Sequence, residues 1–369
     1  MTRILFIHNT AMWYRQHFFK ELSNNYDIYF VFTHMQASKE IYDVQIDNEI
    51  SNLKNVNYKV LKNYWGIAFG IIKEALGNYD VIVGGNWDNF PELVETIFYF
   101  TIAKIRKKKF ILWSEEWDWN KKSSKRKLID PIINLIVKNS NSIIVPGTKH
   151  KENFINMGAY ENKIFIMPNA CAYDSSRESK NQLNHKTIVY VGRLVERKGV
   201  QYLIKAFKKL KSDFNDSKLL IVGDGNYRTE LEKLSEKIGV DGVYFCGQVD
   251  NNELKKYYEM CNICVIPSII CEMGDPWVFV LNEAMYYGMP VVATDAVGAA
   301  FDMIKNGNNG FIVPEKDSEA LCESIKEILS NPVLEKNMGY KSKEIIKNEF
   351  TYKNMINGFN SALNYVINK

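Results

Sequence analysis

The sequence lacks long apolar runs, low-complexity segments and any strong excess of one charge. It has 369 residues, of which 46% are hydrophobic and 24% charged, the composition of an ordinary globular protein. The nearest candidate for a membrane helix, residues 94–105, is shorter than the about 18 to 20 residues needed and contains charges. A chain of this length exceeds what one core usually supports, so we expect two domains and no membrane crossing.

Cysteine is sparse and scattered. Of the six cysteines only Cys261 and Cys264 have CxxC spacing, and no second pair completes a zinc site. The first ten residues lack the charged start, long apolar stretch and cleavage site of a signal peptide. These absences predict reduced, mostly buried thiols, no bound metal and a cytoplasmic protein.

Charge is nearly balanced overall but unevenly distributed. Residues 1–167 hold 22 Lys and Arg against 17 Asp and Glu, a net +5, and the remainder holds 25 against 26, a net −1. Much of the excess lies in two basic clusters, 104–109 and 121–127, which can attract phosphates, anionic lipid headgroups or nucleic acid, or be a solvated face. The clusters occupy a small part of one half, which disfavours a nucleic-acid binder.

Aromatic residues accompany these clusters. The apolar stretch around Phe98, Tyr99 and Phe100 and the pair Trp13 and Tyr14 belong to the same half of the chain. Together with the basic clusters, they predict peripheral contact between the first domain and an anionic membrane, at its inner face.

Short β-branched runs alternate with amphipathic stretches along the whole chain. This alternation is typical of a parallel, doubly wound α/β sheet, and it starts afresh after residue 186. We therefore predict two such domains. The predicted strands lie within 3–9, 26–34, 56–62, 80–86, 109–115, 142–147 and 163–169, and then within 186–194, 218–225, 243–249, 263–268, 290–296 and 310–314.

A polar segment separates the two halves. Residues 167–186 are rich in Ser and Asn and show no period, as expected of a linker. We predict an N-terminal domain over 1–168 and a C-terminal domain over 169–351. The last amphipathic segment, about 352–369, needs an apolar surface to cover it, and we expect it to pack back on the first domain.

Ligands of open α/β sheets bind at the carboxyl ends of strands, so the residues that follow strands carry most weight. One strand ends at Gly192 and is followed by Arg193, Lys198 and Gly199 before a helix begins. Two cations and a flexible turn at a helix N-terminus suit a diphosphate. Pairing of both cations with surface carboxylates is the alternative.

Two glycines, Gly223 and Gly225, follow the next strand. They can let backbone approach a ligand closely, although a strand-to-helix turn often needs glycine for its own conformation. No complete GxGxxG dinucleotide fingerprint occurs in the chain, which disfavours a dehydrogenase.

Residues 272–300 gather three carboxylates around a predicted helix and the strand beyond it. Asp275 followed by Pro276 has the pattern of a helix N-cap with proline at the first helical position, and the helix is expected to end near Tyr287. Glu272 lies in the loop before this helix.

Such a helix start offers two kinds of contact to a ligand. Glu283, two turns further along, can accept hydrogen bonds from ribose hydroxyls. Backbone amides at the helix N-terminus can bind an anion beside the phosphate site. These amides belong to Trp277, Val278 and Phe279.

These motifs resemble the second domain of GT-B-fold glycosyltransferases of the retaining group 1, also called family 4. The similar segments are the phosphate-binding region "VGRLVERKGVQYLIKAF" and the Glu-x7-Glu region that begins at "DPWVFVLNEAMYYGMP". The resemblance is specific over about 165–315 and fainter before it. It implies two Rossmann-like domains facing across a cleft, the GT-B architecture.

The resemblance implies a role for each motif residue. Arg193 and Lys198 would hold the diphosphate of a UDP- or GDP-sugar, Glu283 would bind its ribose, and Asp275 would contact the transferred sugar. Asp275 is shorter than the usual Glu, and Val278 replaces the usual Gly. Glu272 is therefore a rival for the sugar contact, which would leave Asp275 as a helix cap.

The first domain departs from the family pattern as well. Many relatives have a histidine near the reaction centre, where this chain offers Glu115 and Glu116; His8 and His34, each at a strand end, are further candidates. No DxD triplet occurs in the sequence, so we expect transfer without a metal or another cofactor.

We therefore expect an enzyme that moves a sugar from a nucleotide sugar to a glycan or lipid-linked acceptor, with retention, in the synthesis of surface polysaccharides or glycoconjugates. The alternatives are an inactive glycosyltransferase-like binding subunit and a GT-B-fold enzyme of another kind, such as a sugar-nucleotide epimerase or a phosphorylase.

Overall fold

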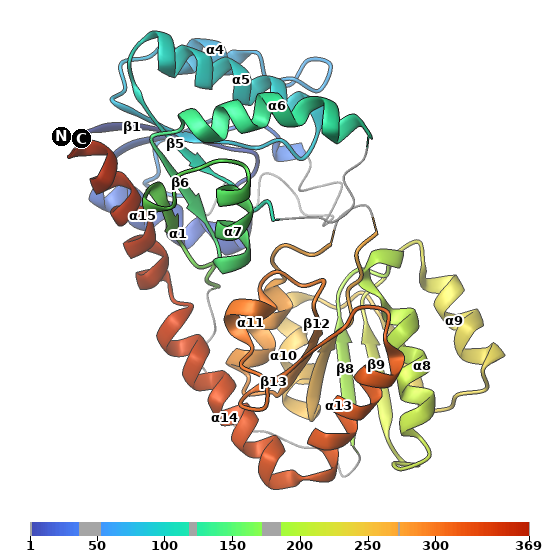
Figure 1. The fold of residues 1–369 in the computed structure, drawn as a ribbon. Helices are drawn as coiled ribbons and strands as arrows, with labels where there is room; N and C mark the ends of the chain where they lie inside the picture. The colour runs from blue at the N-terminus through green and yellow to red at the C-terminus, as the bar shows by residue number, and fades with distance from the viewer. Residues whose placement is uncertain (1, 37–52, 118–123, 172–185, 272–273, 369) are drawn as a thin grey trace. The chain divides into compact units, whose positions relative to one another are not determined.

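The computed structural model describes residues 2–36, 53–117, 124–171, 186–271 and 274–368. The chain divides into two compact units (Figure 1). Unit 1 contains Met1–Asp118, Ser123–Ala172 and Thr351–Lys369, and the rest of the chain forms unit 2. All thirteen predicted strands are present, so the prediction of two parallel α/β units is confirmed.

Unit 1 contains a parallel sheet with the strand order β3-β2-β1-β4-β5-β6-β7. Its central strands are buried along their whole length, because helices cover both faces of the sheet. The strands are β1 (Arg3–His8), β2 (Asp27–Phe32), β3 (Tyr58–Val60), β4 (Val81–Gly84), β5 (Lys109–Trp113), β6 (Ser142–Val145) and β7 (Ile164–Ile166).

Two helices pack on one face of this sheet, and the other face carries most of the remaining helices of the unit. The first pair is α1 (Trp13–Asn25) and α15 (Tyr352–Ile367). The second group is α4 (Gly70–Ala75), α5 (Phe90–Ile105), α6 (Ser124–Asn139) and α7 (Thr148–Asn156), and the short turn η1 (Glu161–Lys163) precedes β7.

Unit 2 contains a second parallel sheet with the order β10-β9-β8-β11-β12-β13. Its strands again alternate with helices, and apolar clusters lie on both of its faces. The strands are β8 (Thr187–Val191), β9 (Lys218–Val222), β10 (Val243–Gly247), β11 (Ile263–Ile266), β12 (Val291–Thr294) and β13 (Gly310–Val313).

The helices of unit 2 divide between the two faces of its sheet. One apolar cluster involves α8, α9 and α13, the other α10, α11 and α12, and α14 contributes to both. Their bounds are η2 (Glu196–Lys198), α8 (Val200–Leu210), α9 (Arg228–Lys237), α10 (Asn251–Met260), α11 (Phe279–Tyr286), α12 (Ala300–Met303), α13 (Ser318–Ser330) and α14 (Pro332–Glu349).

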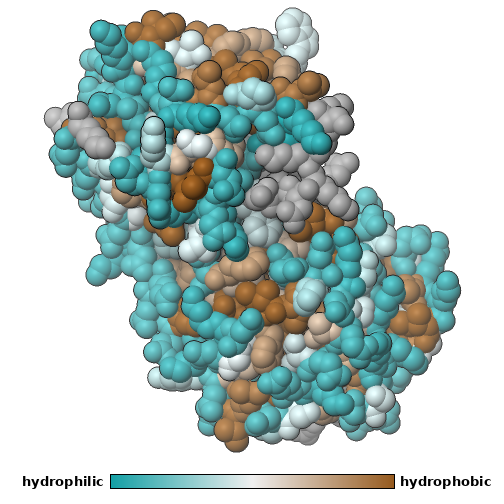
Figure 2. Space-filling model, viewed as in Figure 1, coloured by the Kyte–Doolittle hydropathy of each residue, from teal (hydrophilic) through white to brown (hydrophobic). Residues whose placement is uncertain are grey.

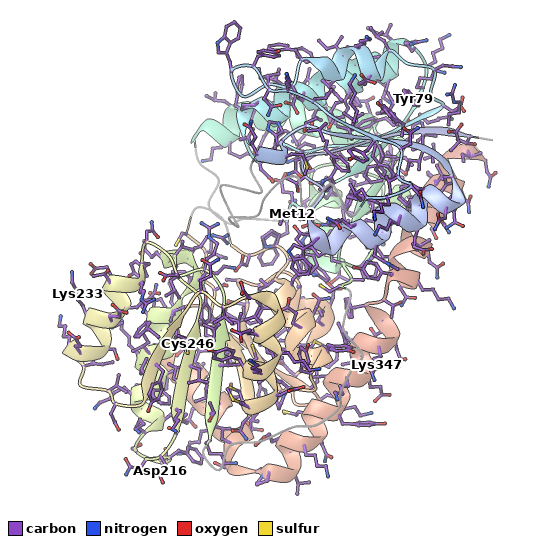
Figure 3. All side chains as sticks on the ribbon, turned by 180° about the vertical axis from the view of Figure 1, so that it is seen from behind. Met12, Tyr79, Asp216, Lys233, Cys246 and Lys347 are labelled. Carbon is purple, nitrogen blue, oxygen red and sulfur yellow. The ribbon has the colours of Figure 1, made fainter. Side chains whose placement is uncertain are left out.

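Most of the cysteines are buried, as the sequence predicts. All six cysteines are free thiols and four are buried; Cys246, on β10, is half-buried and is labelled in Figure 3. The apolar residues 94–105 lie inside α5. Among the described helices, none combines the length and the apolar character that crossing a membrane requires.

Candidate active site

The winding of the unit 2 sheet reverses between β8 and β11. The chain starts in the middle at β8, adds β9 and β10 on one side, and then returns to add β11, β12 and β13 on the other. In open α/β sheets the carboxyl ends of the strands at such a reversal are the usual ligand site. The segments that follow β8 and β11 are therefore where this unit should bind a ligand.

A buried carboxylate joins these two segments. Asp275 is 4% exposed. Its Oδ1 accepts a hydrogen bond from Arg197 Nη1 at 2.8 Å, and its Oδ2 accepts bonds from Lys198 Nζ and Ser268 Oγ, each at 2.6 Å. Arg197 and Lys198 belong to η2 after β8, and Ser268 follows β11. We refer to these four residues as the Asp275 cluster.

Two cations keep this carboxylate ionised. Burial alone would raise the pKa of Asp275, but the charges of Lys198 and Arg197 outweigh burial and lower the pKa below its usual value. The side chain of Lys198 is 15% exposed and that of Arg197 is 34% exposed. The cluster therefore presents two partly accessible positive charges at the reversal of the sheet.

Asp275 is not the helix N-cap that the sequence predicted. Helix α11 begins at Phe279 and its N-cap is Val278. Asp275 instead bridges to Val297, with its backbone N–H donating to Ala296 O at 3.0 Å. An exposed cap hydrogen bond contributes about 1 kcal/mol, whereas pairing a buried carboxylate with two cations avoids a larger desolvation cost.

The late start of α11 also corrects the predicted set of helix amides. Only Phe279 of the three predicted residues is helical. The side chains of Trp277 and Val278 are 8% and 7% exposed and belong to an apolar cluster of unit 2. The Trp277 indole donates to Asn282 Oδ1 at 3.1 Å. Packing accounts for these two side chains.

Glu283 lies on α11, as predicted, with a tyrosine beside it. Its Oε2 accepts a hydrogen bond from the hydroxyl of Tyr258 on α10 at 2.7 Å. Burial raises the pKa of Glu283 to about 7, although the bond from Tyr258 opposes this. Tyr258 is 1% exposed and Glu283 is half-buried, so the tyrosine hydroxyl fixes one oxygen of a partly accessible carboxylate.

The predicted glycines join the loops after β8 and β9. A Cβ on Gly223, whose φ is +131°, would lie 2.0 Å from the carbonyl oxygen of Gly192, and one on Gly225 would lie 2.3 Å from Leu194 O. Gly192 N–H donates to Val222 O at 2.9 Å. Close contact between two backbone segments therefore requires these glycines, and it positions the loop that leads to Lys198.

Of the two predicted cations, only Lys198 contacts Asp275. Arg193 is exposed in the loop after β8, and Arg197 takes the second place beside the carboxylate. Sequence reasoning missed Arg197, Ser268 and Tyr258. Arg197 is adjacent to Lys198 and Ser268 follows a predicted strand, so both carried a usable signal; Tyr258, inside a helix, carried none. Glu272 lies outside the described residues.

Predicted residues of unit 1 also lie at the carboxyl edge of its sheet. Glu115, after β5, is paired with Arg15, and Asn169 Nδ2 donates to its Oε1 at 3.0 Å. Burial would raise the pKa of Glu115, but Arg15 and Asn169 lower it below its usual value. Glu116 accepts hydrogen bonds from two side chains, those of Trp87 and Arg126.

The two histidine candidates have different environments. His8 lies at the end of β1, with its Nδ1 2.8 Å from the carbonyl oxygen of Thr10. Burial, helped by the charge of Arg15, lowers the pKa of His8 to about 3, so the ring is neutral. His34 is instead paired with the buried Glu95, with a distance of 3.0 Å from Nε2 to Oε1.

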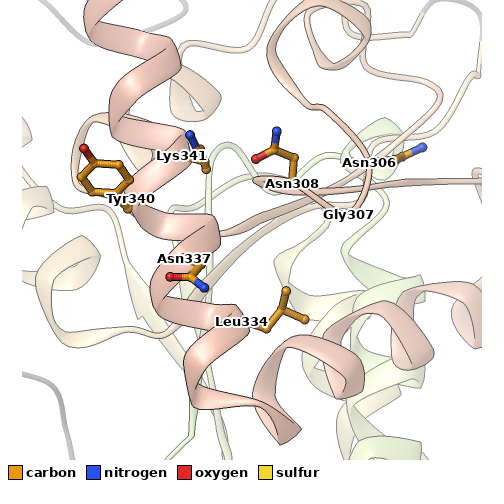
Figure 4. A pocket seen from close by; sticks show the side chains of 7 residues that line it. All are labelled: Asn306, Gly307, Asn308, Leu334, Asn337, Tyr340 and Lys341. Atoms are coloured by element: carbon orange, nitrogen blue, oxygen red, sulfur yellow. The ribbon is translucent and has the colours of Figure 1, made fainter.

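A pocket of about 530 Å³ lies elsewhere in unit 2 (Figure 4). It is formed by the turn before β13 and by α14, with Asn306, Asn308 and Tyr340 among its lining residues. Because that turn precedes a parallel strand, the pocket lies at the amino edge of the sheet, opposite the Asp275 cluster. In the described part of the chain, no group of three or more His, Cys, Asp or Glu side chains is arranged to hold a metal ion.

Comparisons of the sequence with known proteins point to glycosyltransferases. The family profile of "Glycosyl transferases group 1" matches residues 174–345. An uncharacterized glycosyltransferase of Methanocaldococcus jannaschii is 38% identical over 151 residues, which are 41% of this chain and 37% of that protein. The capsular polysaccharide biosynthesis glycosyltransferase CapM of Staphylococcus aureus is 30% identical over 56% of this chain and 57% of its own length. The chain thus spans less than two-thirds of each of these relatives.

The fold is found in solved structures over nearly its full length. Anabaena HepE in complex with UDP superposes with a TM-score of 0.77 at 16% identity, covering 98% of this chain and 99% of that one. At this identity the likeness concerns the fold alone. Residues 174–345 therefore match the profile of group 1 glycosyl transferases, and the two units of the chain share the fold of HepE.

Proposed function

We propose that this protein is a glycosyltransferase that moves a sugar from a UDP- or GDP-sugar to a glycan or lipid-linked acceptor. The observation that carries the proposal is the Asp275 cluster, which presents Arg197 and Lys198 at the reversal of the unit 2 sheet. The name of CapM and the binding of UDP and UDP-glucose by HepE support a nucleotide-sugar donor and a role in polysaccharide or glycoconjugate synthesis.

Unit 2 would bind the donor. Lys198, Arg197 and the exposed Arg193 would contact the diphosphate, and the carboxylate of Glu283 would accept hydrogen bonds from the ribose hydroxyls. During transfer the bond between the anomeric carbon and the phosphate oxygen breaks, and negative charge grows on that oxygen. Two preorganised cations stabilise this charge, while Asp275 holds both in position.

Unit 1 would bind the acceptor. Glu115 is held by Arg15 and Asn169, and a neutral His8 offers a ring nitrogen as a hydrogen-bond acceptor for a sugar hydroxyl. Glu116, which is held by Trp87 and Arg126, would likewise accept a hydrogen bond from a sugar hydroxyl. We further propose cytoplasmic transfer with retention and without a metal, as the family resemblance and the missing DxD triplet imply.

A donor screen tests the proposal. Melting temperatures with UDP, GDP and ADP should identify one nucleotide, because a ligand at 100 times its Kd adds about 2.7 kcal/mol of stability. Release of that nucleotide from its sugars, with and without EDTA, then identifies the donor, and NMR of the glycosylated product gives the anomeric configuration. Nucleotide binding without turnover would instead indicate a binding subunit, and interconversion of the donor sugar would indicate an epimerase.

A further inference from the structure

The exposed apolar side chains of this protein are concentrated on one helical layer of unit 1. Nine of the seventeen large apolar side chains that are exposed in the described part of the chain lie between residues 64 and 135. They belong to α4, α5, α6 and the loops before them, which form one layer on the sheet. Apolar side chains are visible across this layer in Figure 2. We call its outer surface the α4–α6 face.

Helix α6 is apolar on both of its sides. Its inner side packs in the core of unit 1 through Ile133 and Ile136. On its outer side Leu128, Ile132 and Leu135 are 79%, 44% and 56% exposed, with the i, i+4, i+7 spacing of a single helical stripe. The fold of unit 1 does not use this outer stripe, and exposed apolar stripes of this kind mark interaction surfaces.

A strained turn adds a tryptophan to the same face. Tyr64 and Ile67 exchange backbone hydrogen bonds of 2.9 and 3.0 Å around a two-residue turn, Trp65 and Gly66. Both turn residues have positive φ, +52° and +78°, a conformation that Trp adopts only at a cost. Trp65 is nevertheless 94% exposed, so packing within unit 1 does not repay that cost.

Buried polar groups hold this turn in place. The carboxylate of Glu95, on α5, accepts the N–H of Ala68 at 2.7 Å and pairs with His34. The other ring nitrogen of His34 lies 3.0 Å from Asn63 Nδ2. The residues on both sides of the turn are thus fixed to α5 and to the loop after β2, and these bonds fix the position of Trp65.

The exposed charges around the α4–α6 face favour an anionic partner. Among the described residues from 62 to 138, the exposed acidic side chains are Asp80 and Asp88, against six exposed cations. Cations around exposed aromatic and aliphatic side chains complement an anionic lipid surface, where tryptophan lies at the level of the headgroups. The cations are Lys62, Lys73, Arg106, Lys107, Lys127 and Lys138.

We propose that the α4–α6 face docks unit 1 on an anionic membrane, with Trp65 and the outer stripe of α6 entering the headgroup region. The inference rests on the proposed function only in that it expects the acceptor to be borne by that membrane. It also corrects the contacts predicted from sequence, since Tyr99 and Phe100 are buried in the core. Trp13 and Tyr14 start α1, a helix that packs on the other side of the sheet.

Vesicle sedimentation tests the docking. Wild-type protein should bind phosphatidylglycerol-containing vesicles far better than phosphatidylcholine vesicles, and added salt should weaken this binding. Trp65→Ala and the double variant Leu128→Gln/Leu135→Gln should each lower the partition coefficient at least tenfold. Tyr340→Ala, which removes a 69% exposed aromatic ring from unit 2, is the matched control and should not change it.

Further readouts separate the possible outcomes. All variants should keep the wild-type melting temperature and the rate of donor turnover on a soluble acceptor, because the altered residues are exposed and outside the candidate site. Wild-type vesicle binding by the Trp65 and α6 variants would overturn the proposal. So would a monomer–dimer equilibrium that these variants abolish, which would identify a second copy as the partner. Vesicle binding without turnover of any donor would reject the proposed function alone.

Discussion

At the scale of single residues, the candidate site depends on one buried carboxylate that organises two cations. Without Asp275, Arg197 and Lys198 would repel each other, because they are neighbours in the same turn. The carboxylate brings both charges to within hydrogen-bonding distance of its oxygens. A diphosphate that approaches this turn meets cations whose positions are already set, so less ordering entropy is lost on binding.

The two cations should matter more for turnover than for nucleotide affinity. We expect Lys198→Ala to lower kcat about 100-fold, a barrier change of about 2.7 kcal/mol, because the charge it neutralises grows in the transition state. Arg197→Ala should have a similar effect, and Arg193→Ala a smaller one. Steady-state kinetics measures kcat and nucleotide titration measures Kd, and the surface variant Lys336→Gln is the control for both. Near-normal transfer by a folded Arg197→Ala/Lys198→Ala variant would reject this assignment.

Asp275→Asn should be nearly inactive. The amide preserves the shape of the side chain but leaves two cations without a counter-charge, so we expect at least about a 100-fold loss of transfer, or about 2.7 kcal/mol. Thermal melting should show a loss of stability as well. Glu272→Gln should remain within about tenfold of wild type, about 1.4 kcal/mol. If the two variants rank the other way at equal folded fraction, the sugar contact belongs to Glu272.

Glu283 should make stability depend on pH in a defined window. The folded pKa of about 7 lies above the usual value of 4.5, so between these two pH values the unfolded chain loses a proton that the folded chain keeps. Stability should therefore fall as pH rises through this window, by up to about 3 kcal/mol at 1.36 kcal/mol per pKa unit. Glu283→Gln should remove this slope and the exposed Glu327→Gln should keep it, in urea unfolding at pH 5 and pH 7.5. An unchanged slope in Glu283→Gln would mean that another group titrates.

At the scale of elements, the loops after β8 and β9 are joined by backbone hydrogen bonds and close contacts. Besides the contact between Gly223 and Gly192, Leu194 N–H donates to Asp224 O at 2.9 Å and Tyr227 N–H donates to Leu194 O at 2.9 Å. This backbone pairing determines where the chain enters η2 and hence where Lys198 lies. The loop after β9 therefore fixes the position of the loop after β8 and, through it, the position of Lys198.

Gly223→Ala should disturb this support. The added Cβ would lie 2.0 Å from a backbone oxygen, at a positive φ, so two backbone segments must move apart. We expect a loss of more than about 2 kcal/mol of stability and weaker nucleotide binding. Gly239→Ala, at φ +60° with no atom within 4 Å of the new Cβ, is the control and should lose only about 1 kcal/mol. Equal melting temperatures for the two variants would show that the loops can separate freely.

At the scale of the whole molecule, the last helix belongs to the first unit. Helix α15 places Phe359 against Phe6 of β1 and Phe18 of α1, with ring centroids 6.0 and 6.1 Å apart. A Cβ on Gly358 would lie 2.5 Å from Ile166 O, which shows how closely α15 packs on β7. The core of unit 1 is therefore completed by residues that are synthesised after the whole of unit 2.

Phe359→Ala should destabilise one unit and spare the other. The cavity should cost about 3–5 kcal/mol in unit 1, while Phe359→Leu should cost clearly less. In calorimetry we expect the variant to lower one of two transitions, and the nucleotide to raise the other, because unit 2 would bind it. A single transition that responds to both changes would show that the two units unfold together.

The sequence by itself determined the elements and their class. Strand and helix signals are local, because a parallel sheet that is buried on both faces requires continuous apolar runs in its strands and amphipathic helices to cover it. All thirteen strands lie at such apolar runs. The segment after the first strand of unit 2 also identified Lys198 as a candidate, and the predicted helix after Asp275 identified Glu283. The tertiary structure alone decided which side chains meet. Asp275 pairs with cations 77 and 78 residues away, and Tyr258 reaches Glu283 from another helix. Local patterns cannot specify these pairings, because the Asp-Pro signal of a helix cap has the same form whether its carboxylate faces solvent or pairs with two cations from another part of the chain.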